Sequence, residues 1–261
     1  MKRPDVAIPL GITVGLAAIF VGAWMEGVRL GFLWQPAAAL IVFGGTMGAV
    51  LIRRGTGGVG AIFRAVVNLF FDPGSEEIEA TKARLTWLAR LERREGAQAL
   101  EAQAAATNDP LISQALTLVS QYAEAQLVRE RLERILDHED EHGLRDVTTL
   151  EGAASYAPTF GIIGAVLGLI QVLRALADPT QLGVGIATAF VATIYGVGVA
   201  NLILFPLAAR MRERHNNFMR QREAIAEALI ALAAHETPSA ITRKFSADME
   251  LTLQKEKAFS R

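Results

Sequence analysis

Hydrophobic residues are gathered into four long stretches that contain no Asp, Glu, Lys or Arg. These stretches cover residues 6–25, 30–52, 152–173 and 179–209. Each one supplies the roughly 20 consecutive apolar residues that a helix needs to cross the hydrocarbon core of a bilayer. The pattern predicts an all-α integral membrane protein with four transmembrane helices.

The region between the second and third stretches is polar and has helical periodicity. Residues 53–151 contain 12 Lys or Arg and 17 Asp or Glu. Ile78, Leu85 and Leu88 fall on one face of a predicted helix from residue 76 to about residue 94. A second helix is predicted to begin after Asp109 and to keep an apolar side through residue 136. We therefore expect a large helical insert between spans two and three, with no strand.

Basic residues are more numerous at one set of ends of the stretches, since the two short connections carry only Arg29 and Arg174, and this asymmetry predicts the topology. They cluster before residue 6, just after residue 52 and just after residue 209. The positive-inside rule then places both termini and the insert in the cytoplasm. The predicted organisation is 1–52 for transmembrane helices 1 and 2, 53–151 for the cytoplasmic helical domain, 152–209 for transmembrane helices 3 and 4, and 210–261 for a cytoplasmic helical tail. The last span should continue as a helix until Pro238 interrupts the tail.

Composition narrows the class of protein further. Hydrophobic residues make up 51% of the chain, the formal net charge is −1 and there is no Cys. These values disfavour an ordinary soluble enzyme and suggest no nucleic-acid partner, and the missing Cys excludes disulfides and thiolate sites. The basic start followed by a long apolar run is interpreted as a retained first span rather than a cleaved signal peptide.

None of the four stretches contains an acidic residue or a His. An ion that crosses a membrane on a protein usually binds an intramembrane carboxylate. If this protein conducts ions, the carboxylate must come from another chain; the alternative is a scaffold that conducts nothing. Some polar side chains do remain in the last two spans, and these are Thr159, Thr188, Thr193, Tyr195 and Asn201.

Small residues and two prolines mark the last two spans. Gly161, Gly164 and Gly168 recur at helical spacing in span three, and four glycines recur in span four. Such residues permit close packing, either within one chain or against another chain. Pro158 and Pro206 each remove a backbone hydrogen bond and predict a static kink or a hinge.

Several segments resemble flagellar stator A subunits of the MotA/PomA type, within the MotA/TolQ/ExbB proton channel family. Residues 156–170 resemble the third span of that family, residues 192–208 the fourth, and residues 43–46 part of the second. The likeness extends over the whole chain, including the two-plus-two arrangement of spans.

The resemblance implies a partner and an ion pathway. A homo-oligomer of A subunits, expected to be a pentamer, would surround a dimer of a MotB/PomB-type B subunit that carries the ion-binding Asp. Pro158 and Pro206 match the functional prolines of the family and Thr193 its pore-facing threonine, with Thr159 also assigned to the pathway. Ala165 stands where sodium-using members tend to have Thr, which favours protons because a hydroxyl ligand is lost. No cofactor is expected.

The resemblance also assigns a rotor contact within the insert. Arg93 and Glu101 match the charged pair that engages the rotor switch protein of the flagellar C-ring, and Arg90, Arg94 and Glu95 lie nearby. Without the resemblance, these residues would be interpreted as an ordinary solvated helix face. The predicted function is a stator subunit in the bacterial inner membrane that couples inward proton flow to rotation.

Three other functions compete with the stator hypothesis. A TolQ/ExbB-type subunit, which would energise an outer-membrane process, usually has three spans and an external N-terminus. A non-conducting scaffold is the second. An enzyme is the least supported, although residues 138–142 read His-Glu-Asp-Glu-His and fit the letters of a zinc motif. No third ligand is evident, so we predict that the protein is not an enzyme.

Overall fold

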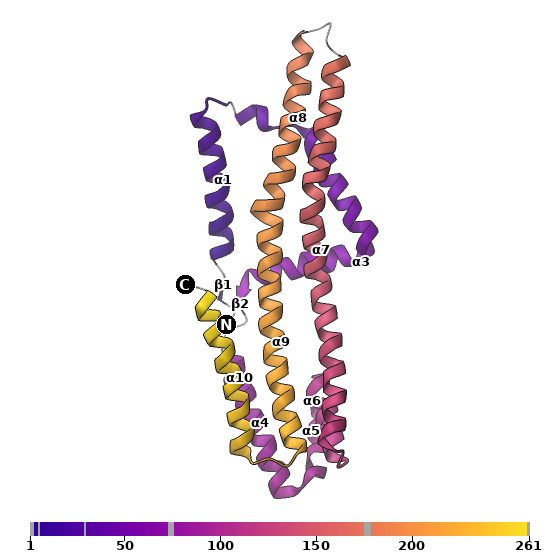
Figure 1. Cartoon of the computed structure of the whole chain (residues 1–261), viewed down its shortest axis with the longest axis vertical. Coiled ribbons are helices and arrows are strands. Elements are labelled where there is room, and N and C mark those ends of the chain that lie inside the picture. The colour runs from indigo at the N-terminus through magenta and orange to yellow at the C-terminus, as the bar shows by residue number, and fades with distance from the viewer. Residues whose placement is uncertain (1–2, 5, 29, 73–75, 175–178, 260–261) are drawn as a thin grey trace. The chain divides into compact units, whose positions relative to one another are not determined.

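The computed structural model describes the chain except for residues 1–2, 5, 29, 73–75, 175–178 and 260–261, and its described part is almost entirely helical (Figure 1). The one departure from the all-helical expectation is a pair of two-residue strands, β1 (Arg3–Pro4) and β2 (Phe71–Asp72), which are antiparallel. The longer α-helices are α1 (Ala7–Met25), α3 (Gly45–Leu69), α4 (Glu76–Glu95), α6 (Pro110–Ser120), α7 (Ala125–Arg174), α8 (Pro179–Val199), α9 (Phe205–Ala233) and α10 (Pro238–Phe259). Shorter elements are the α-helices α2 (Pro36–Ala39) and α5 (Leu100–Ala106), the 3₁₀-helices η1 (Leu30–Leu33) and η3 (Ala97–Ala99), and the π-helices η2 (Leu40–Gly44) and η4 (Ala200–Leu204).

The chain divides into two compact units. The span unit comprises residues 2–72 and 145–212, and the polar unit comprises residues 73–144 and 213–261. Helices α7 and α9 each contribute to both units. Residues 53–72, which the sequence assigned to the insert, fall within the span unit. The side of the membrane on which each unit lies stays a prediction.

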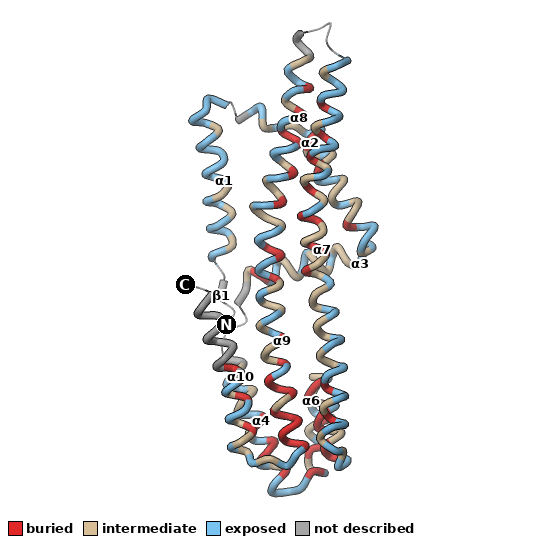
Figure 2. The backbone as a smooth tube through the Cα atoms, in the orientation of Figure 1, coloured by how far each residue is buried: buried red, intermediate tan, exposed pale blue. Residues whose placement is uncertain are grey.

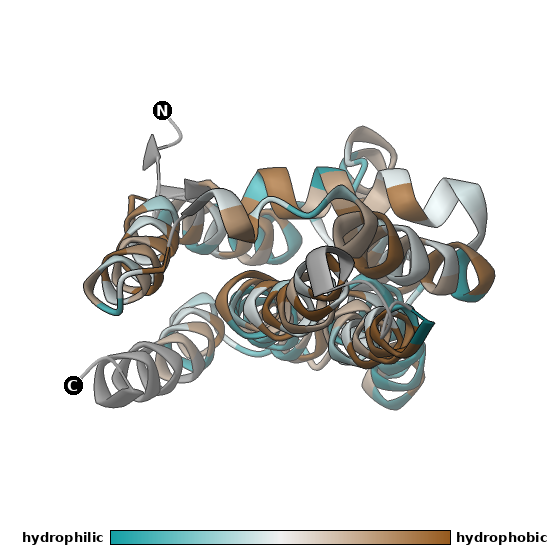
Figure 3. Ribbon diagram, turned by 90° about the horizontal axis from the view of Figure 1, so that it is seen from above, coloured by the Kyte–Doolittle hydropathy of each residue, from teal (hydrophilic) through white to brown (hydrophobic). Residues whose placement is uncertain are grey.

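Four helical segments of the structure are long and apolar enough to cross a membrane, as expected. They lie within Ala7–Met25, Pro36–Leu69, Ala125–Arg174 and Leu182–Ala233. Helix α1 has no buried residue (Figure 2), and hydrophobic residues are spread along the helices (Figure 3). Large apolar side chains such as Ile52 and Phe190 are exposed. Exposed apolar surface on this scale is unfavourable in water. Lipid or other protein chains must therefore cover these helices.

The second span is irregular at two places. Its first turns widen into the π-helix η2, and α3 then bends at Gly55, where φ is +68° and ψ is 177° (Figure 1). A positive φ of this size is accessible to Gly and strained for other residues. The bend lies three residues after the predicted end of the stretch at Ile52. Beyond the bend, Ile62, Val66 and Leu69 pack against apolar residues of α7 and α9.

The fourth span continues into α9 through the π-helix η4, which ends directly before Phe205 and Pro206. Pro206 has no N–H to donate to the carbonyl of Leu202, and its ring crowds that carbonyl. A wider π turn accommodates such a mismatch within a continuous helix. The structure thus contains a distortion where the sequence predicted one; whether it acts as a hinge stays a prediction.

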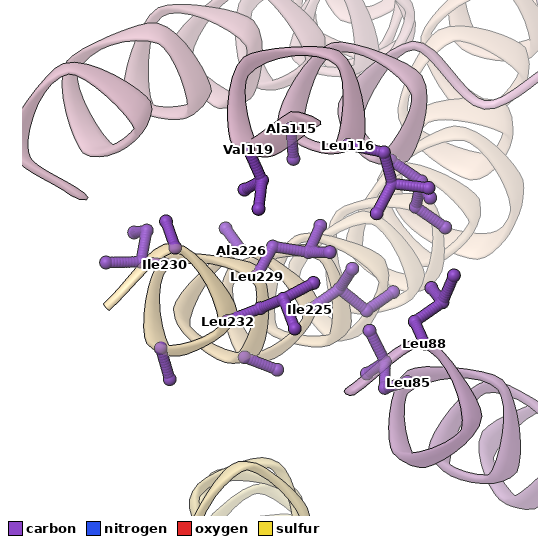
Figure 4. Close-up of a cluster of buried hydrophobic side chains, with 14 of the residues drawn as sticks. Leu85, Leu88, Ala115, Leu116, Val119, Ile225, Ala226, Leu229, Ile230 and Leu232 are labelled. Carbon is purple, nitrogen blue, oxygen red and sulfur yellow. The ribbon is translucent and has the colours of Figure 1, made fainter. Parts of the chain in front are cut away.

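The polar unit has a hydrophobic core in which α9 is central. Ile225, Ala226 and Leu229 on α9 face Leu116 and Val119 on α6 (Figure 4). On α4, Leu85 and Leu88 complete the core, as the periodicity of that helix predicted. The buried side chains come from segments more than a hundred residues apart, so this core joins the insert to the C-terminal segment.

The helix expected from Pro110 to residue 136 is in fact two helices. Helix α6 ends at Ser120 and α7 begins at Ala125, with Tyr122 at φ +57° between them. The amide of Ala123 donates to the carbonyl of Leu118 over 3.0 Å, which closes the end of α6. The prediction of one helix was wrong because the apolar spacing continues across this turn while the backbone does not.

A buried arginine on α9 forms ion pairs with carboxylates at the start of α6 and on α7. Arg222 on α9 is 6% exposed, and it donates to Asp109 over 2.5 and 2.9 Å and to Glu139 over 2.7 and 2.8 Å. Asp109 also caps α6 by accepting from the amide of Leu111 over 3.0 Å. Burial alone would raise the pKa of Asp109, but the hydrogen bonds and charge of Arg222 and the backbone amides outweigh burial and lower that pKa. The same carboxylates raise the pKa of Arg222.

We predict that Arg222→Ala lowers the free energy of unfolding by about 3 kcal/mol at neutral pH, because two carboxylates lose their shared cation. Arg129→Ala serves as the control, since Arg129 pairs with Glu227 at the surface and should contribute about 1 kcal/mol or less. Denaturant unfolding followed by circular dichroism measures both. The Asp109 contribution should be present above pH ~4 and be lost as the pH falls through the lowered folded-state pKa. Equal losses in the two variants would contradict this assignment.

Candidate channel wall and charged contact surface

Helices α7 and α8 approach each other backbone to backbone in the span unit. A Cβ atom placed on Gly196 would lie 3.1 Å from the Cα atoms of both Gly161 and Pro158. One placed on Gly168 would lie 2.8 Å from the carbonyl oxygen of Gly185. These separations leave no room for a side chain, so glycine is required at the contact. The small-residue pattern therefore serves packing within one chain at these positions.

The remaining glycines of the fourth span behave differently. Nothing lies within 4 Å of a Cβ atom placed on Gly183 or Gly198. These two residues point away from α7 in a chain whose outer faces are apolar. They are consistent with the second interpretation of the pattern, in which small residues admit another chain.

Pro158 and Thr193 lie at one level of the α7–α8 contact. Gly196 packs against Pro158, and the Cα of Thr193 lies 3.5 Å from a Cβ placed on Gly161. Pro206 lies on α9, thirteen residues after Thr193 and about 20 Å further along the helix at 1.5 Å per residue. The structure therefore brings together two of the four predicted pathway residues on one interface and places Pro206 elsewhere.

The two threonines of the predicted pathway face outward. Thr159 and Thr193 are both exposed, and their hydroxyls donate to carbonyls of their own helix, at Tyr156 over 2.6 Å and at Ala189 over 3.3 Å. Each hydroxyl oxygen keeps lone pairs that can accept from water or coordinate a cation. The α7–α8 pair thus presents polar oxygen atoms on a largely apolar surface.

Sequence reasoning missed a hydrogen bond that joins the fourth span to the segment connecting the first two spans. The hydroxyl of Tyr195 donates to the carbonyl of Leu33 and lies 3.4 Å from the amide of Gln35. Its ring lies 6.1 Å from that of Phe43. Tyr195 stood out as a polar residue in a span, but its partner 162 positions away could not be found from spacing.

Two ion pairs of the span unit were also missed. Arg54 bonds to Asp146, and Arg212 donates to both carboxylate oxygens of Glu151 over 2.8 and 2.9 Å. The pairs connect α3 and α9 with α7, just beyond the uncharged stretches. Asp146 and Glu151 are therefore both held by guanidinium groups, and neither offers an unpaired carboxylate to a moving ion.

The His-Glu-Asp-Glu-His segment of α7 does not form a metal centre among the described residues. The rings of His138 and His142 lie 4.3 Å apart, edge to face, and Asp140 is bonded instead to His215 over 2.8 Å. Within the part of the chain that the structure describes, no group of three or more His, Cys, Asp or Glu residues could hold a metal ion.

The polar unit carries the five residues assigned to a rotor contact, four of them near the end of α4 and Glu101 at the start of α5. Arg90, Arg93, Arg94, Glu95 and Glu101 are all exposed. The helix ends because Gly96 adopts φ +84°. Just after this turn, Ala97 and Leu100 are buried in the hydrophobic core of the polar unit. The exposed charges therefore lie at a turn whose neighbouring residues are packed in that core.

A buried carboxylate within this region was not foreseen. Glu92 is 8% exposed and bonds to Nδ1 of His235 over 2.8 Å. The interaction joins the end of α4 to the segment between α9 and α10. Glu92 looks like its charged neighbours in the sequence, and only the position of Leu88 one turn earlier indicated that it faces inward.

Four apolar helices, two of which pack backbone to backbone, define a polytopic membrane protein. The profile of the MotA/TolQ/ExbB proton channel family matches residues 103–224, and the profile of the motility protein A N-terminal region matches residues 9–95. The chain belongs to the MotA/TolQ/ExbB proton channel family.

Individual relatives agree with this assignment. The motility protein A of Bacillus subtilis (strain 168) is 28% identical over 90% of this chain and 87% of its own length. In the solved flagellar MotAB stator complex from Bacillus subtilis, a chain is 28% identical with a TM-score of 0.76, covering 90% of this chain and 92% of that one. A chain in the C. jejuni MotAB structure has a TM-score of 0.80 at 22% identity over 94% of this chain and 95% of its own, which shows the fold.

These findings confirm the expected kind of protein, a stator A subunit, and its all-helical membrane fold. They favour it over the TolQ/ExbB-type alternative, because the N-terminal profile that matches is the one specific to motility protein A. The relatives named above are motility proteins rather than enzymes.

We predict that Gly196→Ala destabilises the purified protein by roughly 1–3 kcal/mol, because the added methyl group would collide with the backbone of α7. Gly198→Ala, two residues away and in open space, should be neutral or slightly stabilising. Thermal unfolding in detergent, followed by circular dichroism at 222 nm, compares the two variants. Loss of stability in Gly198→Ala but not in Gly196→Ala would contradict the assignment of Gly196 to the face packed against α7.

Proposed function

We propose that the protein forms, with a MotB/PomB-type B subunit, the proton-conducting stator of a bacterial flagellar motor. The observation that carries this proposal is a pair of tightly packed spans that present threonine hydroxyls outward and contain no carboxylate. Such a wall cannot bind and release a proton alone. It suits a pathway whose titrating group is supplied by a neighbouring chain.

Proton transfer would act through the cost of placing charge in a membrane. A proton entering from outside neutralises the Asp of the B subunit, and a neutral side chain moves along an apolar interface far more readily than a charged one. Thr159 and Thr193 supply oxygen atoms beside that path. The membrane potential contributes about 2.3 kcal/mol per charge for each 100 mV. That energy favours one direction of stepping along a surface without large barriers.

The polar unit would pass the resulting movement to the rotor. Arg90, Arg93, Arg94 and Glu95 near the end of α4 and Glu101 at the start of α5 are exposed charges of both signs. Exposed ion pairs are weak and screened by salt. Weak contacts suit a surface that must bind the rotor switch protein and release it repeatedly.

The finer assignments of the proposal follow from sequence and resemblance. The subunit would lie in the bacterial inner membrane with both termini in the cytoplasm, as a homo-oligomer, expected to be a pentamer, around a dimer of the B subunit. Protons are favoured over sodium because residue 165 is Ala. Pro158 and Pro206 are assigned as hinge residues, and no catalytic role or cofactor is proposed.

Proton flux tests the channel. When the protein is co-expressed with its B subunit in vesicles that carry an internal pH dye, an imposed inward gradient should acidify the lumen. The same vesicles with an Asp→Asn change in the B-subunit span should not acidify, and neither should vesicles with this protein alone. Selective cation flux through this protein alone would contradict the proposal.

Charge reversal tests the rotor contact. Arg93→Glu should reduce swimming in soft agar strongly while membrane abundance and proton flux stay at the wild-type level, because only a surface contact is altered. Arg131→Glu changes an exposed arginine of α7 elsewhere on the polar unit and serves as the control. Normal swimming in Arg93→Glu, or equal loss in the control, would refute the assigned surface.

A further inference from the structure

An open groove lies in the polar unit, between α4 and the beginning of α10, two helices that pack together (Figure 1). Its volume is about 730 Å³, which is in the range of small-ligand sites. Arginine and hydroxyl side chains dominate its lining. The lining residues are Thr86, Arg90, Arg93, Thr237, Pro238, Ser239, Thr242, Arg243 and Ser246.

The groove has three positive charges and no negative one among its lining residues. Arg90 and Arg93 are three positions apart on α4 and share a helix face, while Arg243 comes from α10. Three guanidinium groups around one groove repel one another. The arrangement is therefore unfavourable in isolation and becomes favourable when an anion is present.

Two carboxylates near the groove are paired with other groups. Glu92 is bonded to His235 over 2.8 Å, and Glu236 is bonded to Lys244 over 2.5 Å. Neither His235 nor Lys244 lines the groove. Among the side chains that the structure describes, no carboxylate forms an ion pair with the three arginines of the groove.

The donors of the groove narrow the chemistry of that ligand. Thr86 and Thr242 lie 2.9 Å apart, Oγ1 to Oγ1, and join the two walls, but their hydroxyls already donate to the carbonyls of Lys82 and Pro238. The arginines are therefore the main donors left for a ligand. Thr237 and Ser239 lie at the start of α10, where the helix dipole adds positive potential. A phosphate group has several acceptor oxygens and can bind guanidinium forks from both walls at once. A carboxylate has only two oxygens and would use fewer of these donors.

We propose that this groove binds a small phosphorylated anion, of about the size of a di- or triphosphate group. Arg90 and Arg93 belong both to the groove and to the surface proposed above for the rotor contact. Occupancy of the groove therefore competes with rotor binding, a regulatory consequence that rests on the proposed function. The binding site itself does not depend on that function.

Isothermal titration calorimetry on the full-length protein, purified with its B subunit, tests the site with pyrophosphate as the probe. We expect saturable binding at one site per chain that weakens as NaCl is raised. Arg243→Ala should lower the affinity about tenfold or more, because a charged donor is lost. Arg243→Lys should lower the affinity less, because the charge is kept and only the two-pronged geometry of the guanidinium group is lost. Arg131→Ala should leave the affinity within about twofold of the wild type.

Several outcomes would overturn the proposal. One is the absence of saturable heat with pyrophosphate, and another is equal weakening by Arg243→Ala and Arg131→Ala. A third is tight binding of a Glu-rich peptide when pyrophosphate does not bind, which would make the groove a protein-docking surface. Unchanged thermal unfolding of Arg243→Ala establishes that lost binding is not lost folding.

A pull-down with the rotor switch protein tests the competition separately. Pyrophosphate should reduce capture by the wild type and should have a smaller effect on Arg243→Ala. If the switch protein is not captured even without pyrophosphate, the rotor assignment fails while the calorimetric result stands. If capture occurs and pyrophosphate leaves it unchanged, the competition is refuted.

Discussion

The cost of placing an ionised group in hydrocarbon governs the whole molecule. That cost removes every Asp, Glu, Lys and Arg from four stretches of the chain. The carboxylates and guanidinium groups are displaced to the ends of the spans, where Arg212 pairs with Glu151, and into the polar unit, where Arg222 holds Asp109 and Glu139. The four spans therefore contain no carboxylate of their own, and in the function proposed above a second chain contributes the titrating group.

The same constraint explains why the last two spans pack through backbone atoms. Apolar side chains gain nothing by leaving lipid for other apolar side chains, so close van der Waals contact has to supply the attraction between helices. Glycines at 161, 168, 185 and 196 allow that contact. The described outer surface of the pair carries mainly apolar side chains with a few polar ones, among them Thr159 and Thr193, whose hydroxyls donate to carbonyls of their own helix.

Prediction from the sequence succeeded where a single physical effect, such as hydropathy or helical spacing, determines the local structure. Hydropathy located the four spans, and helical spacing placed Leu85 and Leu88 in the core of the polar unit. The separation of α6 from α7 was missed because apolar spacing records which face is buried and says nothing of a turn at Tyr122. The bend at Gly55 was missed for a similar reason, since one glycine in a helix does not reveal the sign of its φ angle.

The candidate site was predictable only in its local parts. The exposed charges at the end of α4 were found from sequence and resemblance, whereas the partners of Tyr195, Arg54 and Glu92 lie far away along the chain and needed coordinates. Long-range polar pairs leave no periodic trace in a single sequence.

Helix α8 has two sides under different physical constraints. On the side toward α7, a Cβ atom on Gly196 would collide with backbone atoms, so volume and not polarity limits which residue can stand there. One turn earlier, Thr193 is exposed in the single subunit, and its hydroxyl donates to a carbonyl of its own helix. A substitution on the exposed side can therefore change the polarity of that surface without changing how α7 and α8 fit together.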